Sequence, residues 1–299
     1  MKKTLAAVGQ LCSTASLREN AASAGRLIRQ ASESGAKVVF LPEASDYIGG
    51  SAEETVSLAQ NVDESEFMKG IRAHLLDIPE DRRPEISVGV HEPVENEDRV
   101  KNTLLWLDRR GQIKHRYQKI HLFDVDIANG PILKESRSVQ PGTEVIKPFD
   151  TPVGKLGPAI CYDIRFPEHA LRLRSLGAQI IQFPSAFTVR TGQAHWEVLA
   201  RARAIDTQCY VVMPAQVGMH SADGKRHSYG HSLVVDPWGT VVAQAPDITS
   251  DPCIILAEID LDSLQKGKFS PMFFKLYTNN SSTCKHAAMG PTKTRYLWI

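Results

Sequence analysis

Cysteine is scarce in this 299-residue sequence and shows no paired arrangement. Its five cysteines are widely spaced and odd in number, and no two of them form a C-x-x-C pair. We therefore expect neither a disulfide framework nor a structural zinc site. Such cysteine use predicts a reducing compartment, which is the cytoplasm or, as an alternative, the mitochondrion.

Other features that would indicate a class of function are also absent. The 35 Lys and Arg residues nearly balance the 34 Asp and Glu residues, so the net charge of +1 gives no general attraction to nucleic acid or anionic lipid. No apolar run approaches the ~18–20 residues that a membrane span needs. The sequence has no Walker loop, no Gly-x-Gly-x-x-Gly motif and no metal-ligand spacing, so we expect no cofactor and no bound metal.

The basic residues at Met1-Lys-Lys3 resemble the start of a secretory signal peptide. Gln10 interrupts the apolar run that follows it, and no small-residue cleavage site comes next. Residues 4–11 are therefore predicted to form a first strand.

The composition of the chain, with 42% hydrophobic and 23% charged residues, is typical of a folded domain. Strand and helix patterns alternate, and residues 17–34 place apolar side chains at helical spacing. Hairpin patterns at 103–118 and 231–244 predict mixed sheets, while the short apolar strands predict helices packed outside them. We expect an α/β fold in a single domain over residues 1–270, followed by an irregular tail over 271–299.

Three reactive side chains follow β-rich runs directly. They are Glu43, Lys119 and Cys161. Catalytic groups of α/β proteins gather at such strand ends, because a rigid sheet aims the side chain that follows it. These three residues are therefore the candidates for chemistry.

Cys161 lies between an apolar strand and a predicted helix over 164–176. A helix N-terminus supplies partial positive charge and free N–H groups, which would stabilise a thiolate nucleophile. The alternative is an inert buried cysteine. The other cysteines are predicted to lie in the core or, for the last of them, in the tail: Cys12, Cys209, Cys253 and Cys284.

Glu43 follows four apolar residues and a proline, so we expect a desolvated carboxylate whose pKa is raised, as suits a general base. Lys119 could hold a developing oxyanion near a reacting carbonyl. The alternatives are a solvated loop glutamate and a surface lysine that buries only its stem. Histidine is another type of base for a cysteine, and nothing in the spacing selects among His121, His195 and His231.

The nitrilase superfamily of carbon–nitrogen hydrolases has three motifs that this sequence resembles, in the same order, at Leu41-Pro-Glu-Ala-Ser45, Tyr117-Gln-Lys-Ile-His-Leu-Phe-Asp124 and Ala159-Ile-Cys-Tyr-Asp-Ile-Arg-Phe-Pro-Glu168. The resemblance covers residues 4–262. It implies a four-layer α-β-β-α sandwich with two mixed sheets and a homodimer formed through the helices.

The resemblance also implies roles for individual residues. Glu43 would be the general base, Lys119 the stabiliser of the tetrahedral intermediate and Cys161 the nucleophile that forms a thioester. Glu135 matches a second glutamate of the family and would orient Lys119 or the incoming water. The backbone N–H of Tyr162 would share the oxyanion with Lys119.

Within the superfamily, segments such as Tyr229-Gly-His-Ser-Leu-Val-Val-Asp-Pro-Trp-Gly239 resemble the eukaryotic deaminated glutathione amidases. These enzymes repair a metabolic side product by hydrolysing its amide to 2-oxoglutarate and cysteinylglycine. The resemblance leaves an ω-amidase acting on α-ketoglutaramate as an alternative. The residues are also compatible with a catalytically silent scaffold of the same fold, or with a thiol redox sensor centred on Cys161.

Both amide substrates carry a 2-oxo acid, so the site needs a cation for a carboxylate. Arg165, four residues after Cys161, is the candidate, because a guanidinium binds carboxylates through two parallel hydrogen bonds. The alternative is an ion pair between Arg165 and Asp163 or Glu168. Further substrate-binding candidates are Tyr47, Tyr162 and Thr188.

Overall fold

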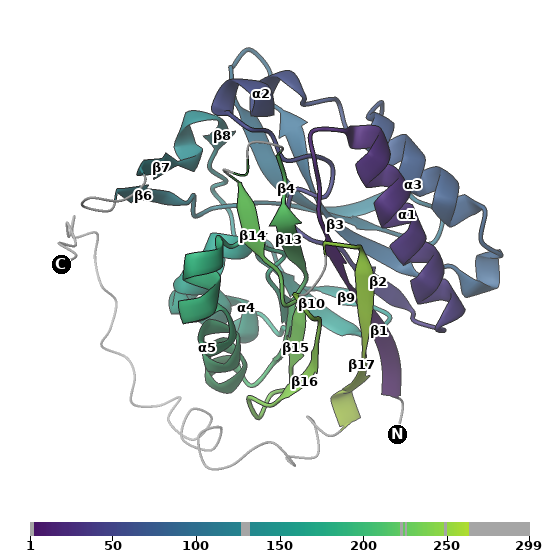
Figure 1. Cartoon of the computed structure of the whole chain (residues 1–299). Coiled ribbons are helices and arrows are strands. Elements are labelled where there is room, and N and C mark those ends of the chain that lie inside the picture. Colours follow the sequence, from purple (N-terminus) through teal and green to yellow (C-terminus); the bar gives the residue numbers. More distant parts are fainter. Residues whose placement is uncertain (1–2, 127–131, 222–223, 225, 248–249, 263–299) are drawn as a thin grey trace.

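Two β-sheets lie face to face in the protein, and helices cover the outer face of each (Figure 1). A computed structural model describes the chain over residues 3–126, 132–221, 224, 226–247 and 250–262. Both sheets contain parallel and antiparallel pairs. The predicted α/β fold with mixed sheets and outer helices is therefore confirmed.

The larger sheet has nine strands, in the order β14-β13-β1-β2-β3-β4-β5, with β17 paired to β1 and β8 paired to β4. Their bounds are β1 Lys3–Leu11, β2 Val38–Phe40, β3 Glu85–Pro93, β4 Val100–Leu107, β5 Ile113–Gln118, β8 Val139–Gln140, β13 Ala215–Met219, β14 His227–Tyr229 and β17 Cys253–Asp260. Pairing is parallel from β1 to β3 and antiparallel from β3 to β5. The predicted strand over 4–11 and the hairpin over 103–118 are present.

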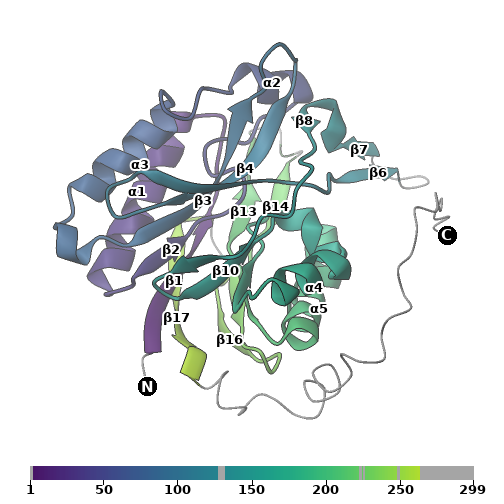
Figure 2. The ribbon, with the colours of Figure 1, turned by 180° about the vertical axis from the view of Figure 1, so that it is seen from behind.

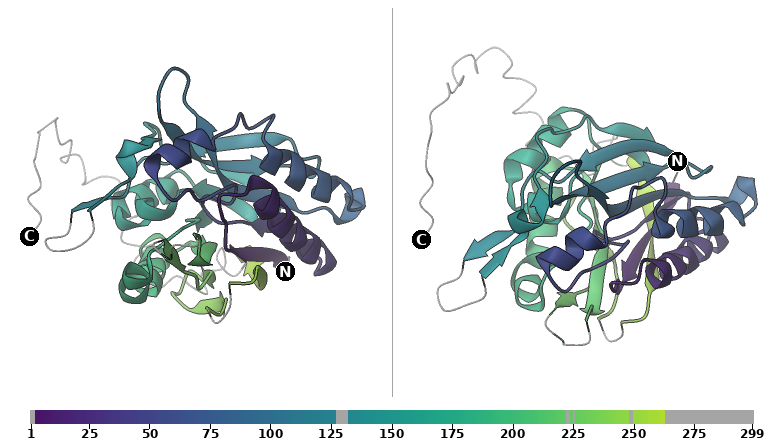
Figure 3. Two further views of the ribbon diagram at one scale, coloured as in Figure 1. Left: turned by 45° about the horizontal axis from the view of Figure 1, so that its top comes forward. Right: turned by 90° about the horizontal axis from the view of Figure 1, so that it is seen from above.

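The smaller sheet has six strands, in the order β16-β15-β12-β11-β10-β9. Their bounds are β9 Phe149–Thr151, β10 Gly154–Pro158, β11 Ile180–Gln182, β12 Tyr210–Met213, β15 Leu233–Val235 and β16 Val241–Gln244. A separate two-stranded hairpin, β6 Asp124–Asp126 with β7 Ile132–Lys134, extends from the body of the molecule (Figure 3).

Two pairs of helices cover the sheets on opposite sides (Figure 2). The helices are α1 Leu17–Glu33, α2 Ala52–Ser57, α3 Glu66–Leu76, α4 Pro167–Ser175 and α5 Val189–Thr207, and the 3-10 turns are η1 Glu80–Arg82, η2 Glu135–Arg137 and η3 Cys161–Arg165. Helices α1 and α3 pack on the nine-stranded sheet, and α4 and α5 pack on the six-stranded sheet. Helix α1 buries the apolar face that its sequence spacing predicts, and its N-cap, Ser16, accepts a hydrogen bond from the Glu19 N–H.

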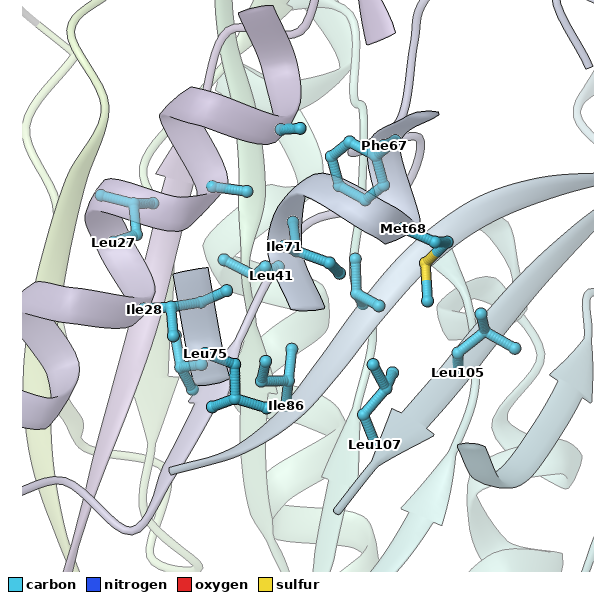
Figure 4. Close-up of a cluster of buried hydrophobic side chains, with 14 of the residues drawn as sticks. Leu27, Ile28, Leu41, Phe67, Met68, Ile71, Leu75, Ile86, Leu105 and Leu107 are labelled. Atoms are coloured by element: carbon cyan, nitrogen blue, oxygen red, sulfur yellow. The ribbon is translucent and has the colours of Figure 1, made fainter. Parts of the chain in front are cut away.

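Three buried apolar clusters separate the four layers. The first joins α1 and α3 to the nine-stranded sheet, and Figure 4 shows Ile28 of α1, Ile71 of α3 and Leu105 of β4 among its side chains. The second fills the space between the sheets, and the third joins the six-stranded sheet to α4 and α5. Because each fully buried Leu or Ile contributes about 1.5–3 kcal/mol, these clusters hold the α-β-β-α order together.

A polar pair also lies between the two sheets. The Ser87 hydroxyl of β3 is 2.7 Å from the Gln182 amide nitrogen and 3.0 Å from the Gln182 amide oxygen of β11. Both side chains are fully buried. Since an unpaired buried polar group costs about 1–3 kcal/mol, this pair favours one alignment of the sheets over others.

Some expectations from the sequence need correction or lie outside the described residues. Cys209 is fully buried as expected, but Cys12 and Cys253 are only half-buried. Cys284 and the predicted tail over 271–299 fall outside the described part of the chain. In the described residues, none of the helices is both long enough and apolar enough to cross a membrane.

Candidate active site

Glu43 is placed by a tight backbone turn at the end of β2. Gly89 of β3 accepts a hydrogen bond from the Ser45 N–H and donates one to the Pro42 carbonyl. A Cβ atom on Gly89 would lie 2.6 Å from the Glu43 Cα, so only glycine permits this approach. The turn therefore holds the Glu43 carboxylate against the end of the sheet.

Lys119 follows β5 and is clamped through its backbone. Its N–H donates to the Asn102 carbonyl at 2.9 Å, and its own carbonyl accepts from the Gly142 N–H at 2.7 Å. The side chain is only 2% exposed. The structure thus excludes the alternative of a surface lysine and directs the ammonium into the protein.

Cys161 follows β10 and opens the 3-10 turn η3, whereas helix α4 begins only at Pro167. The expected helix start at 164 is therefore wrong, because Pro167 fits the first turn of a new helix and not the interior of an older one. The Cys161 φ of 46° is in the left-handed region, and its N–H donates to the Pro184 carbonyl at 3.0 Å. The backbone holds this residue in a conformation that is costly for a non-glycine.

Four side chains form a closed ring of hydrogen bonds. The Lys119 Nζ lies 2.8 Å from Glu43 Oε1 and 2.9 Å from Glu135 Oε1. The Asn102 Nδ2 donates to the same two oxygens, at 2.8 Å and 3.3 Å. One cation and one amide thus sit between two carboxylates, as the role predicted for Glu135 toward Lys119 requires.

Backbone N–H groups also donate hydrogen bonds to both carboxylates. The Ala186 N–H donates to Glu43 Oε2 at 2.9 Å, and the Phe123 N–H donates to Glu135 Oε2 at 2.6 Å. Because Ala186 follows β11 and Phe123 precedes β6, the ring is tied to both sheets and to the projecting hairpin.

The ring fixes the charges of its members. Burial raises the pKa of Glu43, but the Lys119 ammonium and the hydrogen bonds to Glu43 outweigh burial, so the pKa lies below its ordinary value. Burial lowers the pKa of Lys119, but Glu135 and Glu43 outweigh it and hold that pKa well above its ordinary value. Glu43 is therefore ionised and Lys119 protonated at neutral pH, and the expectation of a raised Glu43 pKa is wrong.

The Cys161 thiol lies close enough to Glu43 for each group to shift the pKa of the other, and Cys161 is 8% exposed. Burial and the negative charge of Glu43 raise the pKa of Cys161 well above its ordinary value, although Lys119 acts in the opposite direction. The expected thiolate is therefore not the resting form. A neutral thiol lies beside an ionised carboxylate, which is the arrangement of a nucleophile and its general base.

Two contributors to the site have little or no signal in the sequence. Asn102 lies in β4 between Lys101 and Thr103, before the apolar residues of that strand, so nothing in the local pattern marks it. The Ala186 N–H carries no side-chain signal at all. Because both depend on contacts between segments distant in sequence, only the folded chain identifies them.

Arg165 lies above two aromatic rings, with its guanidinium carbon 5.6 Å from the Tyr162 ring centre and 5.8 Å from that of Phe187. Its Nη2 is 3.1 Å from the Nδ1 of His195. Within the described part of the chain Arg165 forms no ion pair, and its Nε has no hydrogen-bond partner. The alternative of an ion pair with Asp163 or Glu168 is therefore wrong.

The remaining substrate-binding candidates differ in their surroundings. Tyr47 is fully buried, stacks on His91 and donates its hydroxyl to the Thr55 carbonyl at 2.7 Å, so it is not available to a substrate. The prediction that Tyr47 binds substrate is therefore wrong. Thr188 is half-buried at the start of α5, two residues after Ala186.

Tyr162 immediately follows Cys161. Its ring packs edge-on against Phe123 at a centroid distance of 5.1 Å. Among the described residues its N–H donates no hydrogen bond, which leaves it available to an oxyanion.

The three histidines that could replace Glu43 as the base are engaged elsewhere. The Nδ1 of His121 is 2.7 Å from Asp163, that of His195 contacts Arg165, and that of His231 lies 3.0 Å from the Tyr229 carbonyl. In the part of the chain that the structure describes, no histidine hydrogen-bonds to Cys161. Glu43 is the base that the geometry offers.

Comparisons with known proteins agree with this geometry. The family model described as carbon-nitrogen hydrolase matches residues 5–269. The chain is 49% identical over 260 residues to a probable hydrolase, nit2, of Schizosaccharomyces pombe, with 87% of this chain and 92% of that protein covered. It is 44% identical over 270 residues to the deaminated glutathione amidase of Bos taurus, with 88% and 78% covered.

The structure is also similar to a solved one. The crystal structure of the Caenorhabditis elegans NitFhit protein superposes with a TM-score of 0.81 at 43% identity, and the match covers 92% of this chain and 66% of that chain. The curated worm protein is described as a fusion of a nitrilase and a fragile histidine triad protein, and this chain spans 61% of its length.

Proposed function

The chain belongs to the carbon–nitrogen hydrolase family, and we propose that it hydrolyses the amide of deaminated glutathione to 2-oxoglutarate and cysteinylglycine, as a metabolite-repair enzyme. The reaction class follows from the family. The observation that carries the proposal is the neutral Cys161 thiol beside ionised Glu43, with Lys119 held between Glu43 and Glu135. The choice of substrate is supported by relatives named deaminated glutathione amidase.

In the first half-reaction, Glu43 takes the proton of the Cys161 thiol while the sulfur attacks the amide carbon. The negative charge that develops on the carbonyl oxygen is stabilised by the Lys119 ammonium and the Tyr162 N–H. Glu43 then passes the proton to the departing nitrogen. Cysteinylglycine leaves, and the 2-oxoglutaryl group remains on Cys161 as a thioester.

In the second half-reaction, Glu43 takes a proton from water, and the hydroxide attacks the thioester carbon. Lys119 and the Tyr162 N–H stabilise the oxyanion again, and the sulfur leaves as a thiol after regaining the proton from Glu43. Glu135 holds Lys119 in place throughout. Removing one such donor from an oxyanion site typically costs about 10²–10³ in rate, so placement of Lys119 is central.

Arg165 supports a substrate that carries a carboxylate. It has no ion pair in the described chain, its guanidinium lies over the ring of Tyr162, and it ends the 3-10 turn η3 that Cys161 begins. A guanidinium in these surroundings suits the 2-oxo acid end of the substrate. Thr188, two residues from the Ala186 that contacts Glu43, is a further candidate for polar contact with that end.

A substrate panel tests the proposal. Deaminated glutathione, α-ketoglutaramate, a simple nitrile and an N-carbamoyl amino acid are each incubated with the enzyme, and acid products are measured by chromatography. We expect deaminated glutathione to give the highest kcat/KM. Preference for α-ketoglutaramate would indicate an ω-amidase, and preference for either of the last two would contradict the proposed substrate class.

Substitution of Arg165 tests carboxylate recognition. Arg165→Leu should raise KM for both 2-oxo acid amides, by about tenfold or more, because a charge-assisted hydrogen bond contributes about 1.5–3 kcal/mol. Arg190→Leu, which changes an arginine in the first turn of α5, is the matched control and should leave KM unchanged. An equal KM for wild type and Arg165→Leu would exclude this residue from substrate binding.

We also propose that the protein is a homodimer formed through α5. Val198 and Ile205 lie seven residues apart on one face of α5 and are 68% and 49% exposed. Trp238 is 55% exposed at the tip of the β15–β16 hairpin, where the following residue, Gly239, lies against Ile205. Contiguous exposed apolar side chains of this kind mark interaction surfaces.

Light scattering after size-exclusion chromatography tests the dimer. Val198→Glu with Trp238→Arg should convert a dimer into a monomer. Leu76→Glu, at an apolar residue of the opposite helical layer that is 49% exposed, should not. A monomeric wild type, or a double variant that stays dimeric, would contradict this surface.

A further inference from the structure

A buried aspartate connects the segment that carries Cys161 to the segment that carries Lys119. Asp163 is fully buried in η3. Its Oδ2 accepts from the Tyr117 hydroxyl at 2.7 Å and from the Ile160 N–H at 2.9 Å. Its Oδ1 accepts from the His121 N–H at 3.1 Å and lies 2.7 Å from the His121 Nδ1.

The four donors come from both sides of the site. Ile160 is the residue before Cys161, whereas Tyr117 and His121 stand two residues on either side of Lys119. The His121 ring is further fixed by stacking on Phe166, at a centroid distance of 3.6 Å and an angle of 12°. One carboxylate therefore spans the two segments that carry the thiol and the ammonium.

A second aspartate binds a histidine in the same way elsewhere in the site. Asp46, three residues after Glu43, accepts from the His91 N–H at 2.7 Å and lies 3.0 Å from the His91 Nδ1. This pair attaches the Glu43 turn to β3 within the nine-stranded sheet. The Asp163 pair differs because it joins that sheet's Lys119 segment to the six-stranded sheet's Cys161 segment.

The surroundings of Asp163 favour this linking role over metal binding. The side chains of His121, Asp163 and His169 lie close enough to form a metal site, with potential ligand atoms within 4.8 Å of one another. However, both oxygens of Asp163 already accept two hydrogen bonds each, which uses the acceptor capacity of a carboxylate. A cation would have to displace these donors.

We propose that Asp163 is a positioning residue that sets the distance and direction between the Cys161 sulfur and the Lys119 ammonium. The inference rests on the proposed function, in which Lys119 stabilises the oxyanion of the carbonyl that Cys161 attacks. Stabilisation of this kind depends on placement to within a fraction of an ångström, and a misplacement of about 1 Å can cost about 10² in rate.

Two reactions of Cys161 separate positioning from general structural damage. Amide hydrolysis needs the thiol, Glu43 and the oxyanion stabiliser Lys119. Alkylation by iodoacetamide is a displacement at a saturated carbon, which develops no oxyanion. It needs the thiol and Glu43, and it depends on Lys119 only through the positive charge that lowers the pKa of Cys161, not on the exact direction of the ammonium. A variant that loosens only the Lys119 side should lose the first reaction and keep the second.

The variant Tyr117→Phe/His121→Phe makes this change. It removes the tyrosine hydroxyl and the imidazole nitrogen from Asp163, keeps an aromatic ring against Phe166 and leaves the Ile160 N–H bond to Asp163 intact. We expect kcat for amide hydrolysis to fall about 10- to 100-fold, with KM and the alkylation rate of Cys161 each within about threefold of wild type. Tyr117→Phe alone should show a smaller loss of the same pattern.

His115→Phe is the matched control. His115 lies on β5 and stacks on Phe149 at a centroid distance of 3.8 Å, as His121 stacks on Phe166. This control should keep both rates. Unchanged kcat in the double variant, or parallel loss of hydrolysis and alkylation in both Tyr117→Phe and the double variant, would overturn the proposal. Absence of amide hydrolysis and of rapid Cys161 alkylation in the wild type would instead contradict the proposed function.

Discussion

The two sheets contribute different chemistry to one site. Segments that follow strands of the nine-stranded sheet supply its ionised side chains Glu43 and Lys119, and β4 of that sheet supplies Asn102. The six-stranded sheet supplies a neutral thiol on a strained backbone and the N–H of Ala186. Charge is concentrated on one side of the site, and the nucleophile is presented from the other.

This division explains how a buried cluster of charges is tolerated. The Lys119 ammonium forms hydrogen bonds of 2.8–3.0 Å with both Glu43 and Glu135 before any substrate arrives, so each carboxylate has a cationic partner. Burying one of them without its partners would cost several kcal/mol. The six-stranded sheet then adds a group that carries no charge until it reacts. The predictions that follow test this difference between the sheets, from the largest effect to the smallest.

Removal of the thiol should have the largest effect. Cys161→Ala should reduce amide hydrolysis to the detection limit, because no other described group can form the thioester, while the unfolding free energy changes little. Turnover and urea unfolding are measured together. Cys253→Ala, at a half-buried thiol of β17, is the control and should retain full activity. Comparable turnover by Cys161→Ala would refute the nucleophile.

Removal of the base should have the next largest effect. Glu43→Gln should lower kcat by roughly 10²–10⁴, since general base catalysis contributes about that much. The same variant should slow the alkylation of Cys161 at neutral pH, because burial still raises the pKa of the thiol and no base remains beside it to take the proton. Glu85→Gln, at a half-buried glutamate of β3 bonded to Trp106, should leave both rates unchanged.

Asn102 should matter less than the charged residues. Asn102→Leu removes the amide that bridges Glu43 and Glu135, and hydrogen bonds to charged groups contribute about 1.5–3 kcal/mol, so we expect kcat to fall by about 10- to 100-fold. Thr103→Val is the control on the adjacent position of β4, where a buried hydroxyl has no partner. It should keep activity and unfold no more easily than wild type.

The alignment of the two sheets should have a smaller effect, confined to stability. Ser87→Ala leaves the buried Gln182 amide without its partner and should lower the free energy of unfolding by about 1–3 kcal/mol. Ser87→Ala/Gln182→Leu removes both polar groups and should recover most of that loss. Urea denaturation measures both variants, and a double variant weaker than the single one would contradict the pairing.

The smallest expected effect is on the pH dependence of stability. The raised folded-state pKa of Cys161 means that its contribution to stability is present below the unfolded thiol pKa, about 8.5, and is lost as pH rises toward the folded pKa. The unfolding free energy of the wild type should therefore fall as the pH rises above about 8.5. In Cys161→Ala this slope should be shallower, by at most about 1.4 kcal/mol per pH unit. An unchanged alkaline slope would contradict the raised pKa.

Much of the fold could be predicted because its signals are local. The helical spacing of α1 and the hairpin β4–β5 can be identified within windows of fewer than twenty residues. The strands β13 and β14 were not predicted. Strand β13 pairs with β1 about two hundred residues away, and no local pattern encodes such a partner.

The same contrast applies to the site. Glu43, Lys119, Glu135 and Cys161 stand in motifs that the sequence displays, and the structure brings the four together. The predicted pKa directions of Glu43 and Cys161 were wrong. A pKa depends on the distance from the group to nearby charges, and the spacing of residues along the sequence does not give that distance. Tyr47 was misplaced for a related reason, since a tyrosine near a motif can equally fill the core.

The sequence by itself determined the alternation of strands and helices, the residue types available for chemistry and the absence of a general charge bias. Tertiary structure alone decided that Lys119 lies between two glutamates, that Asn102 bridges them and that Asp163 joins the thiol segment to the ammonium segment. The physical reason is the difference in sequence separation between the groups that interact. Hydrophobic periodicity acts between neighbours along the chain, whereas the ionisation and placement of buried groups depend on atoms within a few ångströms that different segments of the chain contribute.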